Sequence, residues 1–382
     1  MAIYLAVKEV LRNKGRFFLF SLVIALITTL VLFIAALGQG LAEANKQYLE
    51  KINAELIVFQ KNVELSTTAS RIARDKLNDI RRVPGVKDLG PVGLASATFV
   101  PSNGGDPLDV SLIGVEPGKP GMPPVIAGSP LRSIRANQTI IDKEVATRTG
   151  LQVGDKMVIK TIQGSDEEFT TLDVIGITDS RQFFFAPSIF VPFSAWENIR
   201  PQPNQANQVP QGIANIVAVQ ISNPREWKSI AAQIQSQVSD VEVVDPKTAY
   251  EAAPGYQAQQ STLNTQRGFT LLIGILVIGG FFQIQTLQKV PQIGVQKAIG
   301  ASNHSLALAV ILQIIFVTFI GVLIGAAGTM SLSLFLPKGI PIIFTGETAL
   351  IAIVSLLMIG PIGGMVSVRL ALKVEPLAAL GM

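Results

Sequence analysis

Four long runs without a charged residue constrain the fold of this 382-residue chain more than any other feature. They cover 17–42, 268–288, 306–336 and 348–368. A helix of about 20 apolar residues crosses the hydrocarbon core of a bilayer, whereas uncharged runs of about 10–14 residues are usual for buried helices of soluble proteins. We therefore expect a polytopic membrane protein with four transmembrane helices.

The composition supports this expectation. Charged residues make up 15% of the chain and apolar residues 48%, against about a quarter charged in ordinary soluble domains. The first run is longer than the apolar core of about 7–15 residues in a signal peptide, so we expect it to remain as an anchor. The chain contains no cysteine, which excludes disulfides, thiolate metal ligands and a cysteine nucleophile.

The basic residues beside the runs predict the orientation. Segments 1–16, 289–305 and 369–382 carry Lys or Arg, whereas 337–347 carries one Lys and one Glu. Short loops rich in Lys and Arg stay in the cytoplasm. We therefore expect both termini in the cytoplasm of a bacterial cell, multiple passes through its inner membrane, and an extracytoplasmic domain over 43–267.

Strand–helix–strand patterns occur near both membrane entries of this outer region. Asn223, Pro224 and Glu226 supply an N-cap, a proline at N1 and a glutamate at N3 for the second helix. An earlier helix is expected over 69–82, with Ala73 on its apolar face. The fold class is thus four transmembrane helices plus an α+β domain of two βαβ units with a mainly β insertion. The expected boundaries are 43–92 and 213–250 for the paired units, 93–212 for the insertion, which includes a loop over 201–211, and 251–267 for a stalk.

The sequence lacks the residues that would give the chain its own catalytic chemistry. It has no GxxxxGK[ST] phosphate-binding loop, no calcium-loop spacing, and a single histidine, His304. No ionisable residue lies within the expected spans, which disfavours an ion-coupled transporter. We expect no catalytic residue, no metal site and no nucleic-acid partner. Within the spans, Gly321 with Gly325 and Gly360 with Gly364 have the GxxxG spacing that lets helices approach closely.

Several motifs resemble those of one transporter family. The segment IGVQKAIGAS at Ile293–Ser302 and the ending RLALKVEPLAAL at Arg369–Leu380 are similar to the signatures of MacB/FtsX-type permeases of ABC systems. The outer segments IGVEPG, AGSPLR, IIDKEVATRTGLQVGDKM and DVIGITDS resemble the periplasmic domain of the same family. The N-terminal AVKEVLRNKGRF and GQGLAEAN look most like the haem-exporter (HrtB-like) and DevC-like branch. Gln292 departs from the glutamate that many members carry.

The resemblance implies a type VII ABC architecture. Two permease chains would bind a separate ATPase, which alone would hold ATP and Mg²⁺, and a periplasmic adaptor and membrane lipid are further expected partners. The family's function implies ATP-driven export of a hydrophobic or amphipathic substrate by mechanotransmission. The alternative is an FtsX-like regulator that conveys ATPase cycling to an extracellular hydrolase. The implied ATPase-coupling residues are Gln292, Ile293, Gly294, Val295, Lys297, Ala298, Ile299, Gly300, Ala301 and Ser302.

Two further expectations concern single side chains. The coupling segment reads as a short helix with Val290, Ile293, Val295 and Ile299 as its apolar side. An apolar substrate cleft is expected at the outer ends of the first two spans. Its candidate residues are Phe33, Leu37, Leu41, Tyr48 and Phe269, and Tyr48, Tyr250 and Tyr256 serve either as haem ligands or as aromatic anchors at the membrane surface.

Overall fold

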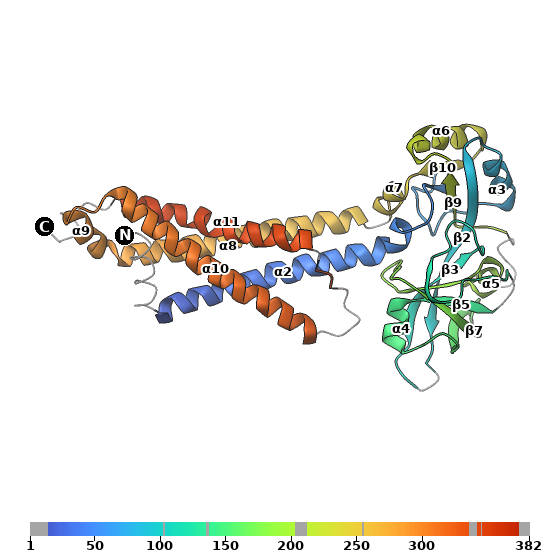
Figure 1. Cartoon of the computed structure of the whole chain (residues 1–382), viewed down its shortest axis with the longest axis horizontal. Coiled ribbons are helices and arrows are strands. Elements are labelled where there is room, and N and C mark those ends of the chain that lie inside the picture. Colours follow the sequence, from blue (N-terminus) through green and yellow to red (C-terminus); the bar gives the residue numbers. More distant parts are fainter. Residues whose placement is uncertain are drawn as a thin grey trace. The chain divides into compact units, whose positions relative to one another are not determined.

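The computed structural model describes residues 14–101, 104–134, 137–202, 212–253, 256–335, 342–344 and 346–373 (Figure 1). The chain divides into two compact units. A membrane unit comprises 1–40 and 260–382, and an ectodomain comprises 41–259. Most of the expected N-terminal segment (1–13), most of the loop 201–211 (203–211) and the end of the tail (374–382) lie outside the described residues.

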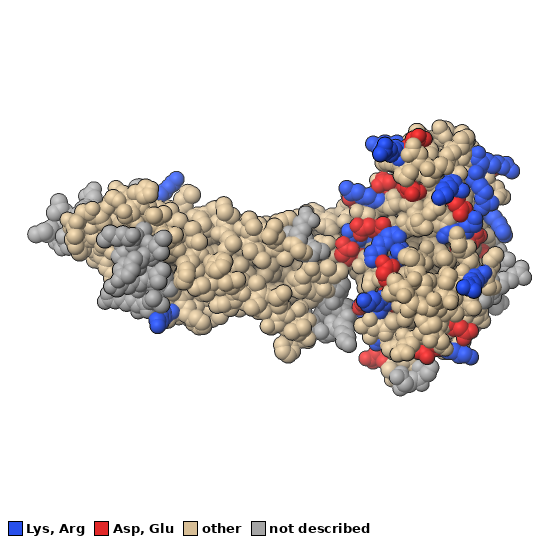
Figure 2. All heavy atoms as spheres, viewed as in Figure 1, with Lys and Arg blue, Asp and Glu red and all other residues tan. Residues whose placement is uncertain are grey.

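The membrane unit is built from four long helices and one short one. The long helices are α2 (Lys14–Glu50), α8 (Tyr256–Gln288), α10 (Asn303–Phe335) and α11 (Gly346–Lys373). All four are long and apolar enough to cross a membrane. Figure 2 shows almost no Lys, Arg, Asp or Glu over these helices, in contrast to the ectodomain.

Each helix extends beyond the uncharged run that predicts it. Helix α2 continues to Glu50, and α8 starts at Tyr256, so most of the expected stalk 251–267 and the span 268–288 are one uninterrupted helix. The reason is that the flanking residues, rich in Gln, Glu, Ala and Lys, favour helix as well. His304 and Arg369, expected in loops, are likewise helical.

Glycines set the helix contacts, as the GxxxG spacing predicts. Gly321 and Gly325 of α10 face α2, where a Cβ added to Gly325 would lie 2.5 Å from the Ala25 carbonyl oxygen. Gly360 and Gly364 of α11 face Thr318 and Ile314 of α10. In lipid the hydrophobic effect does not drive helices together, so van der Waals contact between closely approaching backbones stabilises the packing instead.

The two βαβ units of the ectodomain form one subdomain, as expected. Strand β1 (Leu56–Gln60), helix α3 (Arg74–Arg81) and β2 (Val86–Phe99) make the first unit, and the second is β9 (Ile216–Ile221), α6 (Trp227–Gln237) and β10 (Val241–Val244). The strands lie in the order β10-β1-β9-β2, antiparallel throughout. This interleaving is the ferredoxin-like split βαβ arrangement.

The expected start of α3 is wrong. The helix begins at Arg74 rather than at residue 69, because Ser66–Ser70 form a hydrogen-bonded turn. Ala73 is therefore an exposed N-cap, and Leu77 and Ile80 are the buried residues of the helix.

The insertion continues the same sheet. Its elements are β3 (Leu108–Val115), β4 (Val125–Gly128), β5 (Gln138–Asp142), α4 (Lys143–Thr149), β6 (Lys156–Gln163), β7 (Asp166–Thr178), β8 (Ser188–Pro192) and α5 (Phe193–Ile199). The pairing β2-β3-β8-β5-β7-β6 returns to β2, so six strands close a circle. The boundary drawn at 92/93 falls inside β2, which serves both subdomains, because that strand stays apolar beyond Val92.

The core of the closed circle is apolar and tightly packed. Leu112, Ile141, Met157 and Leu172 are fully buried within it. Trp196 of α5 lies against the sheet where β2 and β3 carry Gly93 and Gly114, and a Cβ at either glycine would overlap the indole. Gly114 of IGVEPG and Gly93 of β2 are therefore places where the Trp196 ring lies on the backbone.

Candidate functional site

The expected coupling segment is a short helix with a defined end. Helix α9 runs from Val290 to Ala298, and Gly300 follows in the left-handed region at φ 96°. The Gly300 amide donates to the Lys297 carbonyl over 3.0 Å, and the Ala301 amide donates to the Gln296 carbonyl over 2.9 Å. These two bonds make a Schellman motif, which favours glycine at that position.

Ser302 starts the next helix. Its Oγ accepts a hydrogen bond from the Ser305 amide at 3.2 Å, which satisfies a free N–H of the first turn of α10. The A-I-G-A-S signature is thus a helix stop followed by a helix start, with Ala301 alone between them.

One face of α9 packs on the membrane unit. Ile293 and Gly294 are buried, and Ile293 forms a small cluster with Leu306. The Lys297 ammonium donates to the Leu372 carbonyl over 2.7 Å, at the end of α11, where the helix dipole favours a cation. Lys297 therefore points to the bundle.

The opposite face of α9 is free of the bundle. Gln292, Val295, Gln296 and Ile299 are exposed at helical spacing, and Ile299 is 82% exposed. The apolar side expected from the sequence is therefore wrong, because Ile293 is buried while Val295 and Ile299 face away. Of the other expected coupling residues, Ala298, Gly300 and Ser302 are exposed and Ala301 is half-buried.

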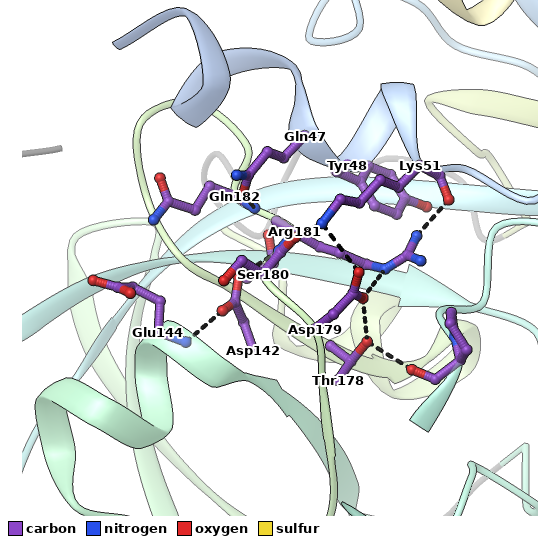
Figure 3. A network of polar contacts seen from close by, with 12 residues as sticks. Gln47, Tyr48, Lys51, Asp142, Glu144, Thr178, Asp179, Ser180, Arg181 and Gln182 are labelled. Atoms are coloured by element: carbon purple, nitrogen blue, oxygen red, sulfur yellow. Dashed lines mark hydrogen bonds and ion pairs between the residues drawn. The ribbon is translucent and has the colours of Figure 1, made fainter. Parts of the chain in front are cut away.

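A second polar site lies where α2 ends, within the ectodomain. We call it the stalk anchor and define it as Gln47, Tyr48 and Lys51 with 179–182 (Figure 3). The Tyr48 amide donates to the Gln182 carbonyl over 3.1 Å, and the Gln182 amide donates to Gln47 Oε1 over 3.1 Å. The Lys51 ammonium donates to Asp179 Oδ2 over 3.0 Å.

Arg181 is the centre of this anchor and is only 6% exposed. Its Nη1 donates to the Lys51 carbonyl over 2.5 Å and its Nε to Asp179 Oδ1 over 2.7 Å. Its backbone amide donates to Asp142 Oδ2 over 2.9 Å, and its carbonyl accepts from Ser188 Oγ over 2.6 Å. One residue thus ties the end of α2 to the N-cap of α4 and to β8.

The two carboxylates of this region differ in their electrostatics. Burial raises the pKa of Asp142 to about 6, although backbone N–H groups of Arg181, Glu144 and Ser188 favour its ionised form. Partial burial also disfavours the charge on Asp179, but the hydrogen bonds from Arg181 and Lys51 outweigh it and hold its pKa below the usual value. Asp179 is therefore the carboxylate whose charge the fold stabilises, and Asp142 the one whose charge the fold disfavours.

The expected substrate-cleft residues differ in their exposure. Tyr48 is fully buried, and its hydroxyl donates to the Gly121 carbonyl over 3.0 Å, so it neither lines a cleft nor ligates iron. Phe33, Leu37 and Leu41 are half-buried along α2, whereas Phe269 is 61% exposed on α8.

The other two tyrosines expected near the membrane lie together. The Tyr250 and Tyr256 rings pack edge to face at 5.9 Å between centroids, and the Lys46 ammonium lies 5.4 Å from the Tyr250 ring. A cation and two rings at one place are typical of an aromatic belt.

Sequence reasoning missed two features. One is Arg181, which directly follows the DVIGITDS segment, so the family motif ends one residue short of the anchor's centre. The other is a groove of about 450 Å³ in the membrane unit. It is lined by Phe20, Leu276, Val277, Gly280, Phe281, Ile284, Gln285 and Gln288. Among the described residues, no group of three or more His, Asp or Glu is placed to hold a metal.

Comparison with known families agrees with this architecture. The MacB-like periplasmic core domain matches residues 17–245, and the FtsX-like permease C-terminal domain matches 268–376. The chain belongs to the MacB/FtsX-type permeases of ABC transporters, and it is a multi-pass membrane protein.

Individual relatives cover nearly the whole chain. A putative hemin transport system permease protein HrtB of Staphylococcus haemolyticus is 27% identical over 99% of both chains, and one from Staphylococcus epidermidis is 28% identical over the same shares. An uncharacterized ABC transporter permease of Mycobacterium bovis is 20% identical over 99% of both chains.

Solved structures match about half of the chain. The extracellular domain of the noncanonic ABC-type transporter YknZ from Gram-positive bacteria is 18% identical at a TM-score of 0.36, covering 50% of this chain and 99% of that one. The periplasmic region of MacB from Actinobacillus actinomycetemcomitans is 14% identical at a TM-score of 0.37, with 51% and 90% covered.

Proposed function

We propose that this chain is the membrane subunit of an ATP-driven exporter, and that the exposed face of α9 is where its ATPase pushes. That face, formed by Gln292, Val295, Gln296 and Ile299, carries the proposal. Two aliphatic side chains left in water at helical spacing fit a hydrophobic groove on a partner. The buried face and the Lys297–Leu372 bond support it by fixing α9 to the bundle, so that a force on α9 reaches α10 and α11.

The remaining parts of the complex follow from the family. A separate ATPase holds ATP and Mg²⁺, two copies of the permease dimerise, and a periplasmic adaptor is an optional third partner. The termini and α9 face the cytoplasm, where ATP is available, and the ectodomain faces outward. The basic segments 1–16, 289–305 and 369–382 support this orientation.

We further propose a hydrophobic or amphipathic substrate taken from the outer leaflet or the space beyond it. Haem is the first candidate to test, because the staphylococcal relatives are named for hemin transport. The mainly apolar surfaces of α2 and α8 suit such a molecule better than a hydrophilic solute.

The test is hemin-stimulated ATP hydrolysis by the complex of this chain and its ATPase in lipid nanodiscs. Ile299→Glu and Val295→Asp are expected to reduce the stimulation by at least about tenfold, since a charge in an apolar groove costs more than about 1.4 kcal/mol. The melting temperature of the permease should stay unchanged, because both side chains are exposed. Gly294→Asp is a poorer test, because Gly294 is buried.

The matched control is Ile162→Ser, which changes another exposed aliphatic residue, 57% accessible and located on β6 of the ectodomain. It should leave the stimulation intact. Full stimulation with Ile299→Glu would contradict the assigned docking face. No stimulation by hemin in the unaltered complex, with basal hydrolysis present, would reject hemin and leave the docking face to be tested by pull-down of the ATPase.

A further inference from the structure

A tight turn of the ectodomain exposes two adjacent phenylalanines. Phe183 and Ala186 exchange two backbone hydrogen bonds of 3.0 and 3.1 Å, so Phe184 and Phe185 are the central residues of a two-residue turn. Their side chains are 37% and 51% exposed. Phe183, by contrast, is buried in the core beside Tyr48, with 6.1 Å between the ring centroids.

The backbone of this turn is unsuited to phenylalanine. Phe184 and Phe185 have φ angles of 49° and 59°, in the left-handed region. Turns with positive φ at both central residues favour Asn-Gly or Asp-Gly, since bulky side chains are strained there. Folding alone therefore does not account for two exposed rings at these positions, and an outlier of this kind points to a function for the side chains.

The turn is fixed to α2 close to the end of its uncharged run. The Phe185 amide donates to the Ala44 carbonyl over 3.2 Å. Ala44 is two residues beyond Ala42, where the uncharged run ends. A phenylalanine ring reaches about 6 Å from its backbone, which equals the rise of about four helical residues. The turn is thus within one side-chain length of the apolar part of α2.

The same stretch of α2 has other features of a membrane interface. Lys46, two residues beyond Ala44, lies over the Tyr250 ring, and Tyr250 packs on Tyr256. Tyrosines are enriched at this depth, whereas the Lys46 ammonium is held by ion pairs of 3.0 Å to Glu43 and to Glu50. The turn of Phe184 and Phe185 is joined to the same helix two residues nearer the uncharged run, at Ala44.

We propose that Phe184 and Phe185 insert their rings into the interfacial layer of the leaflet from which α2 emerges. The partner is the lipid surface, and the turn seats the ectodomain on it next to α2. Both rings are exposed at the turn, while the buried Phe183 anchors it in the core, with its ring 4.6 Å from that of Phe184.

The absence of cysteine makes a direct test practical. The full chain carrying Phe185→Cys is labelled with a small fluorophore and reconstituted into phosphatidylcholine–phosphatidylglycerol vesicles. Lipids brominated at the headgroup end of the acyl chain are expected to reduce its fluorescence to roughly half, and lipids brominated at the chain terminus to reduce it less. Phe184→Cys serves as a second site, in case one substitution disturbs the turn.

Phe169→Cys is the matched control. Phe169 is 56% exposed on β7, and its partner on the neighbouring strand β6 is Lys160, a charged residue. Its label should respond to aqueous iodide and not to brominated lipid. Iodide quenching at 184 and 185 equal to that at 169, without lipid quenching, would overturn the proposal. A disulfide between two copies of the unlabelled Phe185→Cys variant, with no lipid quenching of the labelled one, would also overturn it and assign the turn to the dimer. The vesicles contain no ATPase, so the result does not depend on the proposed export.

Discussion

The membrane unit and the ectodomain hold together by opposite means. In the membrane unit, helices meet where glycines remove side chains, as at Gly325 against Ala25 and Gly363 against Ile275. In the ectodomain, fully buried aliphatic side chains fill both faces of a ten-stranded sheet, and a buried arginine organises the loops.

The difference follows from the two solvents. Water drives apolar side chains together, so the ectodomain gains from every large buried residue. Lipid tails are as apolar as leucine, so helices in a bilayer gain mainly from close contact and from hydrogen bonds such as Thr29 Oγ1 to the Gly325 carbonyl, at 3.1 Å. Small residues are thus critical in one unit and large ones in the other. Four substitutions test this contrast.

The largest effect is expected in the membrane unit. Gly325→Leu would place a Cβ 2.5 Å from the Ala25 carbonyl oxygen, which leaves no room without separating α10 from α2. We expect a cost above about 3 kcal/mol and loss of the monodisperse peak in size-exclusion chromatography. Gly280→Leu is the control, because nothing lies within 4 Å of its added Cβ. Equal loss in both variants would contradict packing by close approach.

Arg181→Ala tests the polar centre of the ectodomain. It removes the side-chain hydrogen bonds to Asp179 and to the Lys51 carbonyl, so each of these acceptors loses one donor. A cost of about 3 kcal/mol is expected, measured as the thermal transition of the tryptophan fluorescence of the full chain, whose two tryptophans, Trp196 and Trp227, both lie in the ectodomain. Lys51→Ala breaks a 39%-exposed ion pair to the same Asp179 and should cost below about 1 kcal/mol. Similar costs for the two variants would mean that burial does not decide the anchor's strength.

The pH dependence of stability sharpens the electrostatic part of the comparison. The pKa of Asp142 in the folded state is about 6, above its ordinary value of 3.8. The protonated carboxyl therefore stabilises the folded state, and this contribution to the free energy of unfolding is lost as pH rises from about 4 to about 6. Asp179 acts in the opposite sense, because its folded pKa is lowered and its contribution is lost in acid. The stability of the wild type minus that of Asp142→Asn should therefore fall by about 2–3 kcal/mol over that pH range. A flat difference would show that Asp142 titrates normally.

The smallest effect is a gain. Phe185→Gly replaces a ring at φ 59° by the residue that adopts this angle most readily, and the ring it removes is half exposed. We expect stability to rise by up to about 1 kcal/mol in detergent. Phe169→Gly, in a strand, should instead lower it by about 1 kcal/mol. A loss as large at 185 as at 169 would give the ring a packing role inside the ectodomain.

Elements with a strong local pattern could be predicted from the sequence. The strands Leu108–Val115 and Val241–Val244 can be recognised from the sequence, since both are rich in valine and other aliphatic residues and lie between Pro, Gly or Asp residues typical of turns. Strand β5 is harder to predict, because Ile141 and Asp142 directly adjoin the helix-favouring Lys143–Thr149 and share no turn with it. Asp142 in fact ends the strand and caps α4.

The candidate sites show where local patterns fail. The Gly300 stop and the Ser302 cap are local features, because their hydrogen bonds join residues no more than five positions apart. The direction of Lys297 is not local, because its acceptor at Leu372 lies on another helix. The stalk anchor joins Lys51 to Arg181 across more than a hundred residues of chain. Likewise, Tyr48 looks like an interfacial tyrosine until the loop at Gly121 closes over its hydroxyl.

Ala301 has a mechanical consequence as the lone link between two capped helices. With the hydrogen bonds of Gly300 and Ala301 closing α9 and Ser302 opening α10, the joint has almost no slack in which to absorb a displacement. In the proposed mechanism, a displacement of α9 by the ATPase would therefore pass to α10 as a tilt, unless the cap itself melts. Inserting a few flexible residues at Ala301 would let α9 move without displacing α10, while every helix remained folded.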